Sequence, residues 1–234
     1  MSILTLFVVI PLLMLLGLWL SKNLNQVRGV MVVGATALLA LSIWLTVYFI
    51  DQRASGNTAN MLLTYSVTWF EPLKIAYSVG VDGISVVMIL LSAIIVFTGT
   101  FASWQLKPLT KEYFLWFVLL SIGVFGFFIS TDMFTMFMFY EVALIPMYLL
   151  IGVWGTGPKE YSAMKLTLML MGGSALLILG ILGIYFFSGA QTMNVADLAQ
   201  LHAMPKSIQN IFFPFVFIGF GVLGALFPFH TWSP

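Results

Sequence analysis

The sequence predicts an all-α integral membrane protein, a polytopic bundle of about seven transmembrane helices. Its 234 residues are 61% hydrophobic and 7% charged, whereas an ordinary soluble domain has about 25% charged residues. A surface with so little charge must face lipid rather than water. The apolar residues also gather in runs of roughly 20, the length of helix that crosses about 30 Å of hydrocarbon.

Seven runs of this kind lie within a single predicted transmembrane domain over residues 1–234. The predicted helices are residues 2–21, 29–50, 83–104, 113–130, 132–154, 163–187 and 207–227. The first run lacks a basic amino-terminal region and a small-residue cleavage site, and its apolar stretch is longer than the core of a usual signal peptide. We therefore expect it to be a retained helix.

The segment 51–82 is the only sizeable polar stretch and is predicted to be an outer loop. Within it, residues 65–70 and 74–78 alternate apolar and polar side chains, and Glu71 and Pro72 lie between them. This pattern predicts a short β-hairpin on the outer surface. Asp82 then precedes the third helix and is expected to cap its amino terminus.

Lysine and arginine predict the orientation of the chain. One predicted side carries Lys22, Arg28, Lys107, Lys111, Lys159 and Lys165. The other carries Arg53, Lys74 and Lys206. The positive-inside rule therefore places the amino terminus outside the cytoplasm and the short basic loops inside it.

The composition also excludes several functions. A formal net charge of +1 argues against nucleic acid as a partner. Cysteine is absent, which rules out disulfides, thiolate metal sites and cysteine-ligated iron–sulfur clusters in these residues. The two histidines, His202 and His230, flank one apolar segment at its opposite ends, so they do not suit a haem held between transmembrane helices. We expect neither a metal nor a redox cofactor in this chain.

Glu141 is the residue that the apolar pattern does not explain. It lies near the middle of the fifth predicted helix, roughly 13 Å deep at 1.5 Å per residue from its outer end. An acidic side chain at such a depth costs about 2.5–3.5 kcal/mol. Burial disfavours its charged form unless a cation or a file of water lies nearby. A carboxyl in this state can take up and release protons near neutral pH, so Glu141 is expected to exchange a proton. A protonated strut between helices, or a site for another cation, are the alternatives.

Pro146 lies one turn and a half beyond this acid. Proline has no N–H, so the carbonyl of Val142 loses its helical partner. A kinked helix with a free carbonyl beside an acid can hold ordered water in a cavity lined by protein. Pro146 is therefore predicted to help hydrate the surroundings of Glu141.

Three further ionisable residues lie at or near the ends of predicted helices. Lys165, at the start of the sixth helix, is expected to extend to the headgroups, and the alternatives are proton entry or partnership with Glu141. Asp132 is expected to cap the fifth helix. His230 follows the last helix between two prolines, where it either relays a proton or acts as a hydrogen-bonding hinge. The small residues 172–175 are expected to let the sixth helix approach a neighbour closely.

Several separated blocks together resemble one family. The run from Phe139 to Gly155, with Pro-Met-Tyr-Leu-Leu-Ile-Gly-x-Trp-Gly at its end, is similar to the fifth helix of the antiporter-like subunits of respiratory complex I. It is most like subunit M of NADH-quinone oxidoreductase, the bacterial counterpart of mitochondrial subunit 4. The blocks 80–85, 161–165 and 228–232 match the same family in order and spacing.

The resemblance implies a proton-translocating membrane subunit of complex I in the bacterial inner membrane. Glu141 and Lys165 match charged residues of the family, and His230 lies in its Pro-x-His-x-Trp block. The implied partners are neighbouring antiporter-like subunits, whereas NADH, flavin, iron–sulfur clusters and quinone belong to other subunits. In the implied mechanism, charge on Glu141 shifts between neighbouring subunits and changes the proton affinity of buried lysines. A multisubunit sodium/proton antiporter and a structural membrane scaffold are the alternatives.

The chain departs from the family pattern in two ways. Leu223 stands where the family usually has a lysine in the seventh helix. The family's chains also have about twice as many helices, so we interpret these residues as an amino-terminal fragment. Taken alone, it is not expected to pump protons.

Overall fold

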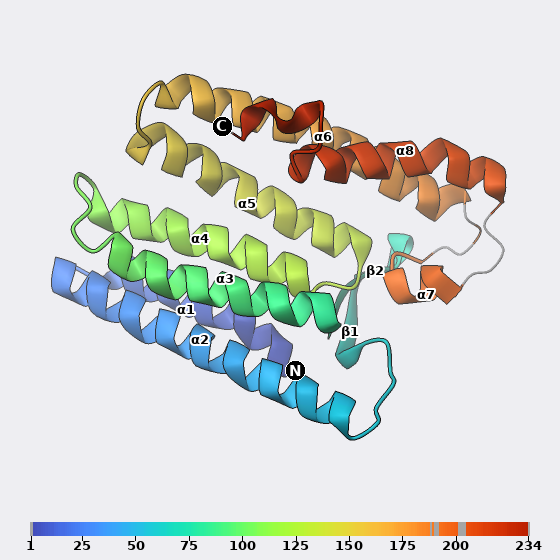
Figure 1. Ribbon diagram of the computed structural model, residues 1–234, viewed down its shortest axis with the longest axis horizontal. Coiled ribbons are helices and arrows are strands. Elements are labelled where there is room, and N and C mark those ends of the chain that lie inside the picture. The colour runs from blue at the N-terminus through green and yellow to red at the C-terminus, as the bar shows by residue number, and fades with distance from the viewer. Residues whose placement is uncertain (1, 188, 190–191, 201–204, 234) are drawn as a thin grey trace. The chain divides into compact units, whose positions relative to one another are not determined.

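The computed structural model describes residues 2–187, 189, 192–200 and 205–233 (Figure 1). His202 lies outside the described residues. In the part of the chain that is described, seven helices are long and apolar enough to cross a membrane. The prediction of seven transmembrane helices is therefore confirmed. Six of their helical segments are α1 (Leu6–Leu20), α2 (Leu24–Ala54), α3 (Gly83–Ala102), α4 (Thr110–Ile129), α5 (Met133–Trp154) and α6 (Lys159–Phe187), and the seventh is α8 (Lys206–Leu223).

The predicted hairpin is present between α2 and α3. Strands β1 (Leu62–Phe70) and β2 (Ile75–Val81) form a two-stranded sheet. The turn between them contains a short 3-10 helix and ends at Lys74, which has a left-handed backbone with φ of 50°. Asp82 caps α3 as predicted, because its Oδ1 accepts a hydrogen bond from the Ser85 backbone N–H at 2.7 Å.

The chain divides into two compact units. The first contains residues 1–65 and 79–129, and therefore α1 to α4. Its core is rich in phenylalanine, with Phe7, Phe114 and Phe125 almost fully buried. The rings of Phe7 and Phe125 lie 5.5 Å apart, an ordinary spacing for packed aromatic side chains.

The second unit contains residues 66–78 and 130–234. Helices α5 and α6 form a hairpin, and α8 packs on α6 (Figure 1). A Cβ on Gly173 would lie 2.8 Å from Cβ of Val222, and a Cβ on Gly219 would lie 3.0 Å from the Gly173 carbonyl oxygen. The close approach predicted for the small residues of the sixth helix is therefore present, with α8 as the neighbour.

Several elements differ from the sequence prediction. Helix α2 begins five residues before and ends four residues after the predicted helix 29–50, because polar residues at both ends of the apolar run continue the helix. The last long helix ends at Leu223 rather than at residue 227, because Ala225 has a left-handed backbone with φ of 52°. A non-glycine residue gives no sequence signal for such a break. In addition, a short helix, α7 (Val195–Gln200), precedes α8 and was not predicted. A final 3-10 turn covers Phe229–Trp232, which includes His230.

Candidate functional site

Helix α5 begins at a buried and fully engaged carboxylate. Asp132 is 1% exposed. Its Oδ1 accepts a hydrogen bond from the Thr135 N–H at 2.9 Å, and its Oδ2 accepts one from the Ala76 N–H of β2 at 3.3 Å. The Thr135 hydroxyl donates to the Ala76 carbonyl at 2.8 Å. The predicted cap is confirmed, and it also ties the helix to the hairpin.

Burial raises the pKa of the Asp132 carboxyl, and the hydrogen bonds that it accepts from Thr135 and Ala76 only partly oppose this effect. Desolvation disfavours the charged form, whereas hydrogen bonds to the carboxylate favour it. Asp132 lies just outside α5, at the end of the helix that carries the hairpin contacts. Its partners are sufficient to explain an acid at this position.

The segment before α5 also pairs with two distant segments. Thr131 N–H donates to the Ser78 carbonyl of β2 at 2.9 Å, and Met133 N–H donates to the Met193 carbonyl, also at 2.9 Å. The Ser78 hydroxyl accepts hydrogen bonds from the Thr131 hydroxyl and the Asn194 amide. The sequence analysis missed this network, since its members are 53 and 116 residues apart.

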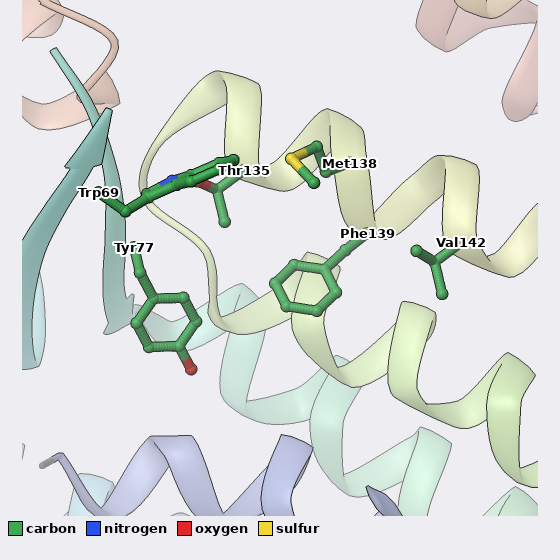
Figure 2. A pocket seen from close by; sticks show the side chains of 6 residues that line it. All are labelled: Trp69, Tyr77, Thr135, Met138, Phe139 and Val142. Carbon is green, nitrogen blue, oxygen red and sulfur yellow. The ribbon is translucent and has the colours of Figure 1, made fainter. Parts of the chain in front are cut away.

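An apolar pocket of about 250 Å³ lies beside the amino-terminal part of α5. Figure 2 shows Trp69 and Tyr77 on the hairpin side and Thr135, Met138, Phe139 and Val142 on the helix side. Glu141 is not among the lining residues. The pocket therefore does not hydrate the predicted functional acid.

Glu141 differs from Asp132 in its surroundings. The residue is half-buried, and its Oε1 is fully buried with no hydrogen-bond partner among the described residues. A buried carboxylate oxygen without a donor is unfavourable by about 1–3 kcal/mol or more. The Glu141 Oε1 is thus a buried polar atom near mid-helix whose hydrogen-bonding capacity is not met by the described residues.

Tyr140, the residue before Glu141, was not selected from the sequence. Its side chain is 7% exposed, and its hydroxyl donates a hydrogen bond to the Leu170 carbonyl of α6 at 3.2 Å. The sequence feature that could have identified Tyr140 is a tyrosine within an apolar helix. A buried tyrosine hydroxyl needs a hydrogen-bond partner, so such a residue predicts a contact with a neighbouring helix. This bond fixes α5 against α6 at the level of the candidate acid.

Pro146 is buried inside α5, which continues through it as one helix from Met133 to Trp154. Its predicted role in hydrating Glu141 stays a prediction. On the carboxyl-terminal side of Glu141, Ala143 is half-buried and Leu144 is buried. Both are apolar residues that lie between the acid and Pro146 in the sequence of α5.

Lys165 is half-buried on α6 and does not bind Glu141 Oε1. Gly152 faces Ala163, at 3.5 Å for a Cβ on the glycine, and Tyr140 reaches Leu170. On α6, Lys165 lies between these two contacts, whereas Glu141 on α5 lies beside the second of them. A direct contact would require both side chains to extend along the helices.

The final turn packs against an apolar cluster through two aromatic residues, and His230 is not among the residues of that contact. Phe229 and Trp232 contact the apolar cluster of Leu144, Leu166, Leu170 and Val222, and the Trp232 indole N–H donates to the Val222 carbonyl at 2.9 Å. His230 is exposed and stacks on Phe227, with ring centroids 5.5 Å apart. In this arrangement Trp232, rather than His230, holds the turn against the helices.

Leu223 belongs to the same layer. It packs against the cluster that contains Leu144, which lies one helical turn from Glu141 on α5. A cation at position 223 would therefore contact this apolar cluster. Within the described ranges, no group of three or more histidine, cysteine, aspartate or glutamate residues is placed to hold a metal.

Comparisons with known proteins agree with this arrangement. The transmembrane family described as NADH:quinone oxidoreductase/Mrp antiporter matches residues 130–234. A chain 4-2 of NAD(P)H-quinone oxidoreductase from Synechocystis is 31% identical over 178 residues, which are 76% of this chain and 32% of that protein. Subunit M of NADH-quinone oxidoreductase from Rickettsia prowazekii is 29% identical over 238 residues, covering 100% of this chain and 48% of the relative. The chain is a homologue of subunit M.

Solved structures show the same fold for this subunit M homologue. A chain of respiratory complex I from Thermus thermophilus matches 98% of it with a TM-score of 0.84 and 22% identity, over 45% of that chain. A chain of the Mrp complex from Dietzia matches 98% with a TM-score of 0.79 and 20% identity, over 42% of that chain. The resemblance found in the sequence is confirmed, and the homologue spans less than half of the length of these relatives. It is a multi-pass membrane protein.

Proposed function

We propose that this chain is part of a proton-translocating membrane subunit of an NADH:quinone oxidoreductase, and that Glu141 exchanges a proton during turnover. The names of the relatives support the class of complex. The single observation that carries the role of Glu141 is its buried Oε1, which has no hydrogen-bond partner among the described residues. A structural strut would use that oxygen.

The chemistry follows from the same oxygen. When Glu141 is ionised, the negative charge lies in apolar protein and is poorly solvated. Taking up a proton neutralises the carboxylate and supplies an O–H donor. The acid therefore responds to any cation that approaches or leaves, because a nearby positive charge favours its ionised form. This response is what coupling between buried charges requires.

Lys165 and His230 are proposed to act at a distance from Glu141. Lys165 lies in the first part of α6, five residues before Leu170, whose carbonyl accepts the Tyr140 hydrogen bond. It is therefore suited to proton entry at the basic end of α6 rather than to a permanent ion pair with Glu141. His230 is exposed on the final turn, where its imidazole is accessible as a proton relay. Water or further protein groups would link these residues to Glu141.

The oxidation and reduction steps are proposed to occur in other subunits. These 234 residues contain no cysteine and two histidines, so they offer few ligands for iron–sulfur clusters or haem. NADH, flavin, iron–sulfur clusters and quinone would then bind elsewhere in the complex. The proposed partners are the other membrane subunits, above all those with the same antiporter-like fold, together with the lipid bilayer.

The amino terminus is proposed to lie on the periplasmic side of the bacterial inner membrane. The excess of lysine and arginine at the other end of the helices supports this orientation. Cysteine-scanning labelling tests it, since these residues contain no native cysteine. With Asn57→Cys in the outer loop and Thr156→Cys in the link between α5 and α6, a membrane-impermeant maleimide added to intact cells should label the first and not the second. The reverse pattern would overturn the orientation.

A multisubunit sodium/proton antiporter remains the second candidate, because a chain of an Mrp complex has the same fold. The relatives named after quinone oxidoreductases favour the first candidate. Proton and sodium fluxes separate the two. Quinone-dependent proton uptake that persists without sodium supports the oxidoreductase, whereas strictly sodium-dependent exchange without NADH supports the antiporter.

Replacement of Glu141 by glutamine in the full-length protein tests the proposed role. Glutamine preserves the shape of the side chain but cannot titrate. In the assembled complex reconstituted in vesicles, Glu141→Gln should reduce NADH-driven proton uptake at least tenfold, a general acid–base contribution being typically 10²–10⁴. The matched control is Glu160→Gln, an exposed acid in the first turn of α6. Unchanged pumping by an assembled Glu141→Gln complex would contradict the proposal.

A further inference from the structure

An open apolar groove runs between α1 and α2 in the first unit. Its volume is about 600 Å³. It is lined by one face of each helix, including Ile10, Leu13, Gly17, Gly29, Val33 and Ala37. A concave surface of this kind along two transmembrane helices is a place where an apolar ligand can be held on several sides.

The depth of the groove depends on glycine. A Cβ on Gly29 would meet no atom within 4 Å, so the space in front of this residue is open. A Cβ on Gly17 would lie 3.1 Å from a methyl group of Val30, so a larger residue there would close the wall. Small residues on both helices thus leave this groove open, whereas larger side chains would interdigitate and fill it.

The groove covers half of the membrane rather than all of it. Its lining on α2 extends from Gln26 to Ala37, about 16 Å at 1.5 Å per residue, whereas α2 continues to Ala54. Half of a hydrocarbon core about 30 Å thick is about 15 Å. The length therefore fits an acyl chain from one leaflet better than a partner helix, which would cross both.

The mouth of the groove is basic. Gln26, at its end, accepts a hydrogen bond through Oε1 from the Lys22 backbone N–H at 2.9 Å. Beside it, Lys111 Nζ donates to the carbonyls of Ser21 at 2.8 Å and Trp19 at 3.1 Å. The charged residues at this end of the unit are Lys22, Arg28, Lys107 and Lys111, with Glu112 as the acid among them. Lys22 is an exposed residue.

We propose that this groove binds an anionic phospholipid, with one acyl chain along Gly29 and the phosphate beside Lys22 and Lys111. The apolar channel supplies the contact for the chain, and the lysines supply the charge that selects the headgroup. The site lies in the first unit and does not depend on the proposed role of Glu141. The acyl chain of a zwitterionic lipid would fill the same groove, but its headgroup has no net charge and would be attracted less strongly by the lysines.

Photolabelling of the full-length protein tests this site. The protein is reconstituted in phosphatidylcholine vesicles that contain a trace of phosphatidylglycerol with a photoactivatable group on its acyl chain, and the labelled peptides are mapped by mass spectrometry. We expect labels on residues 10–17 and 29–37. Gly29→Leu should remove this labelling, because leucine fills the channel. Gly172→Leu is the matched control, since a Cβ on Gly172 also meets no atom within 4 Å and this residue lies on α6.

The contribution of the headgroup is measured separately. Lys22→Gln should reduce the labelling by the phosphatidylglycerol probe about fivefold, the effect of one lysine near an anionic lipid surface. A phosphatidylcholine probe with the same acyl chain should label the wild-type groove less and should not respond to Lys22→Gln. Equal labelling by both probes, or unchanged labelling of Gly29→Leu, would overturn the proposal. Protection of residues 10–37 in the assembled complex would show that a partner helix, rather than a lipid, occupies the groove.

Discussion

One acid caps the amino terminus of helix α5 and another lies near the middle of the helix, and their surroundings differ. Asp132 is 1% exposed, and both of its oxygens accept hydrogen bonds from backbone N–H groups. Glu141 is half-buried, yet its Oε1 is enclosed without a partner. Both acids are unusual in so apolar a helix, but only the first is explained by the fold.

The comparison shows that burial alone does not separate a structural acid from a functional one. The useful question is whether each buried oxygen has a donor. Asp132 has donors from the helix that it caps and from the hairpin, so its replacement should affect folding. Glu141 lacks a donor on Oε1, so its replacement should affect proton transfer more than folding. The following experiments test this division.

The largest stability effect is expected for Asp132→Ala. It removes a helix cap, typically about 1 kcal/mol, and leaves the buried Ala76 N–H without its acceptor, about 1–3 kcal/mol more. We therefore expect a loss of about 2–4 kcal/mol, measured by reversible unfolding of the full-length protein in mild detergent. Glu141→Ala, the comparison variant, should cost clearly less. An equal or larger loss for Glu141→Ala would contradict the division.

A coupling experiment at Leu223 sharpens the account of Glu141. Leu223 packs on the cluster next to Leu144, one helical turn from the acid. Leu223→Lys introduces a cation in this layer and should be tolerated better with Glu141 present than with Glu141→Gln. In a double-mutant cycle we expect a favourable interaction of about 1–3 kcal/mol between the two side chains. A coupling energy of zero would show that position 223 does not face the acid.

Tyr140→Phe should have a smaller effect. It removes the hydrogen bond from the tyrosine hydroxyl to the Leu170 carbonyl, for which a loss of about 1 kcal/mol in unfolding free energy is expected. Tyr148→Phe is the control on the same helix, because that side chain is 39% exposed, and it should change stability by less than about 0.5 kcal/mol. Equal effects would mean that the Tyr140 bond does not hold α5 against α6.

The smallest expected effect is the pH dependence of Asp132. Burial raises the pKa of its carboxyl above the ordinary value of 3.8, so the folded protein binds this proton more tightly than the unfolded chain. The resulting stability is fully present below pH 3.8 and is lost as the pH rises through the raised pKa. Asp132→Asn cannot titrate. The stability of the wild-type protein relative to this variant should therefore increase on acidification, and the opposite slope would contradict the burial effect.

The general fold follows closely from the sequence. The seven apolar runs predict the seven long helices, and the alternation in residues 65–78 predicts the hairpin, because each pattern reflects which faces are buried. Asp82 and Asp132 were predicted as caps from their position alone. The end of α8 was wrong by four residues, since the left-handed backbone at Ala225 has no local signal.

The site was harder to predict for a physical reason. Glu141 could be selected because an acid in an apolar helix is costly wherever its partners lie. Its missing donor, the Tyr140 bond to Leu170 and the packing of Leu223 depend on contacts between helices. The Ser78 network joins residues 53 and 116 positions apart. No periodicity in one segment contains that information.

Infrared difference spectroscopy on the assembled complex shows whether the Glu141 carboxyl changes its protonation state during turnover. Spectra are compared between resting enzyme and enzyme turning over with NADH and quinone, for the wild type and for Glu141→Gln. The account predicts a protonated-carboxyl C=O band that changes during turnover in the wild type and is absent from the variant. Identical carboxyl bands in both proteins, with electron transfer intact, would show that Glu141 keeps one protonation state and would contradict the claim.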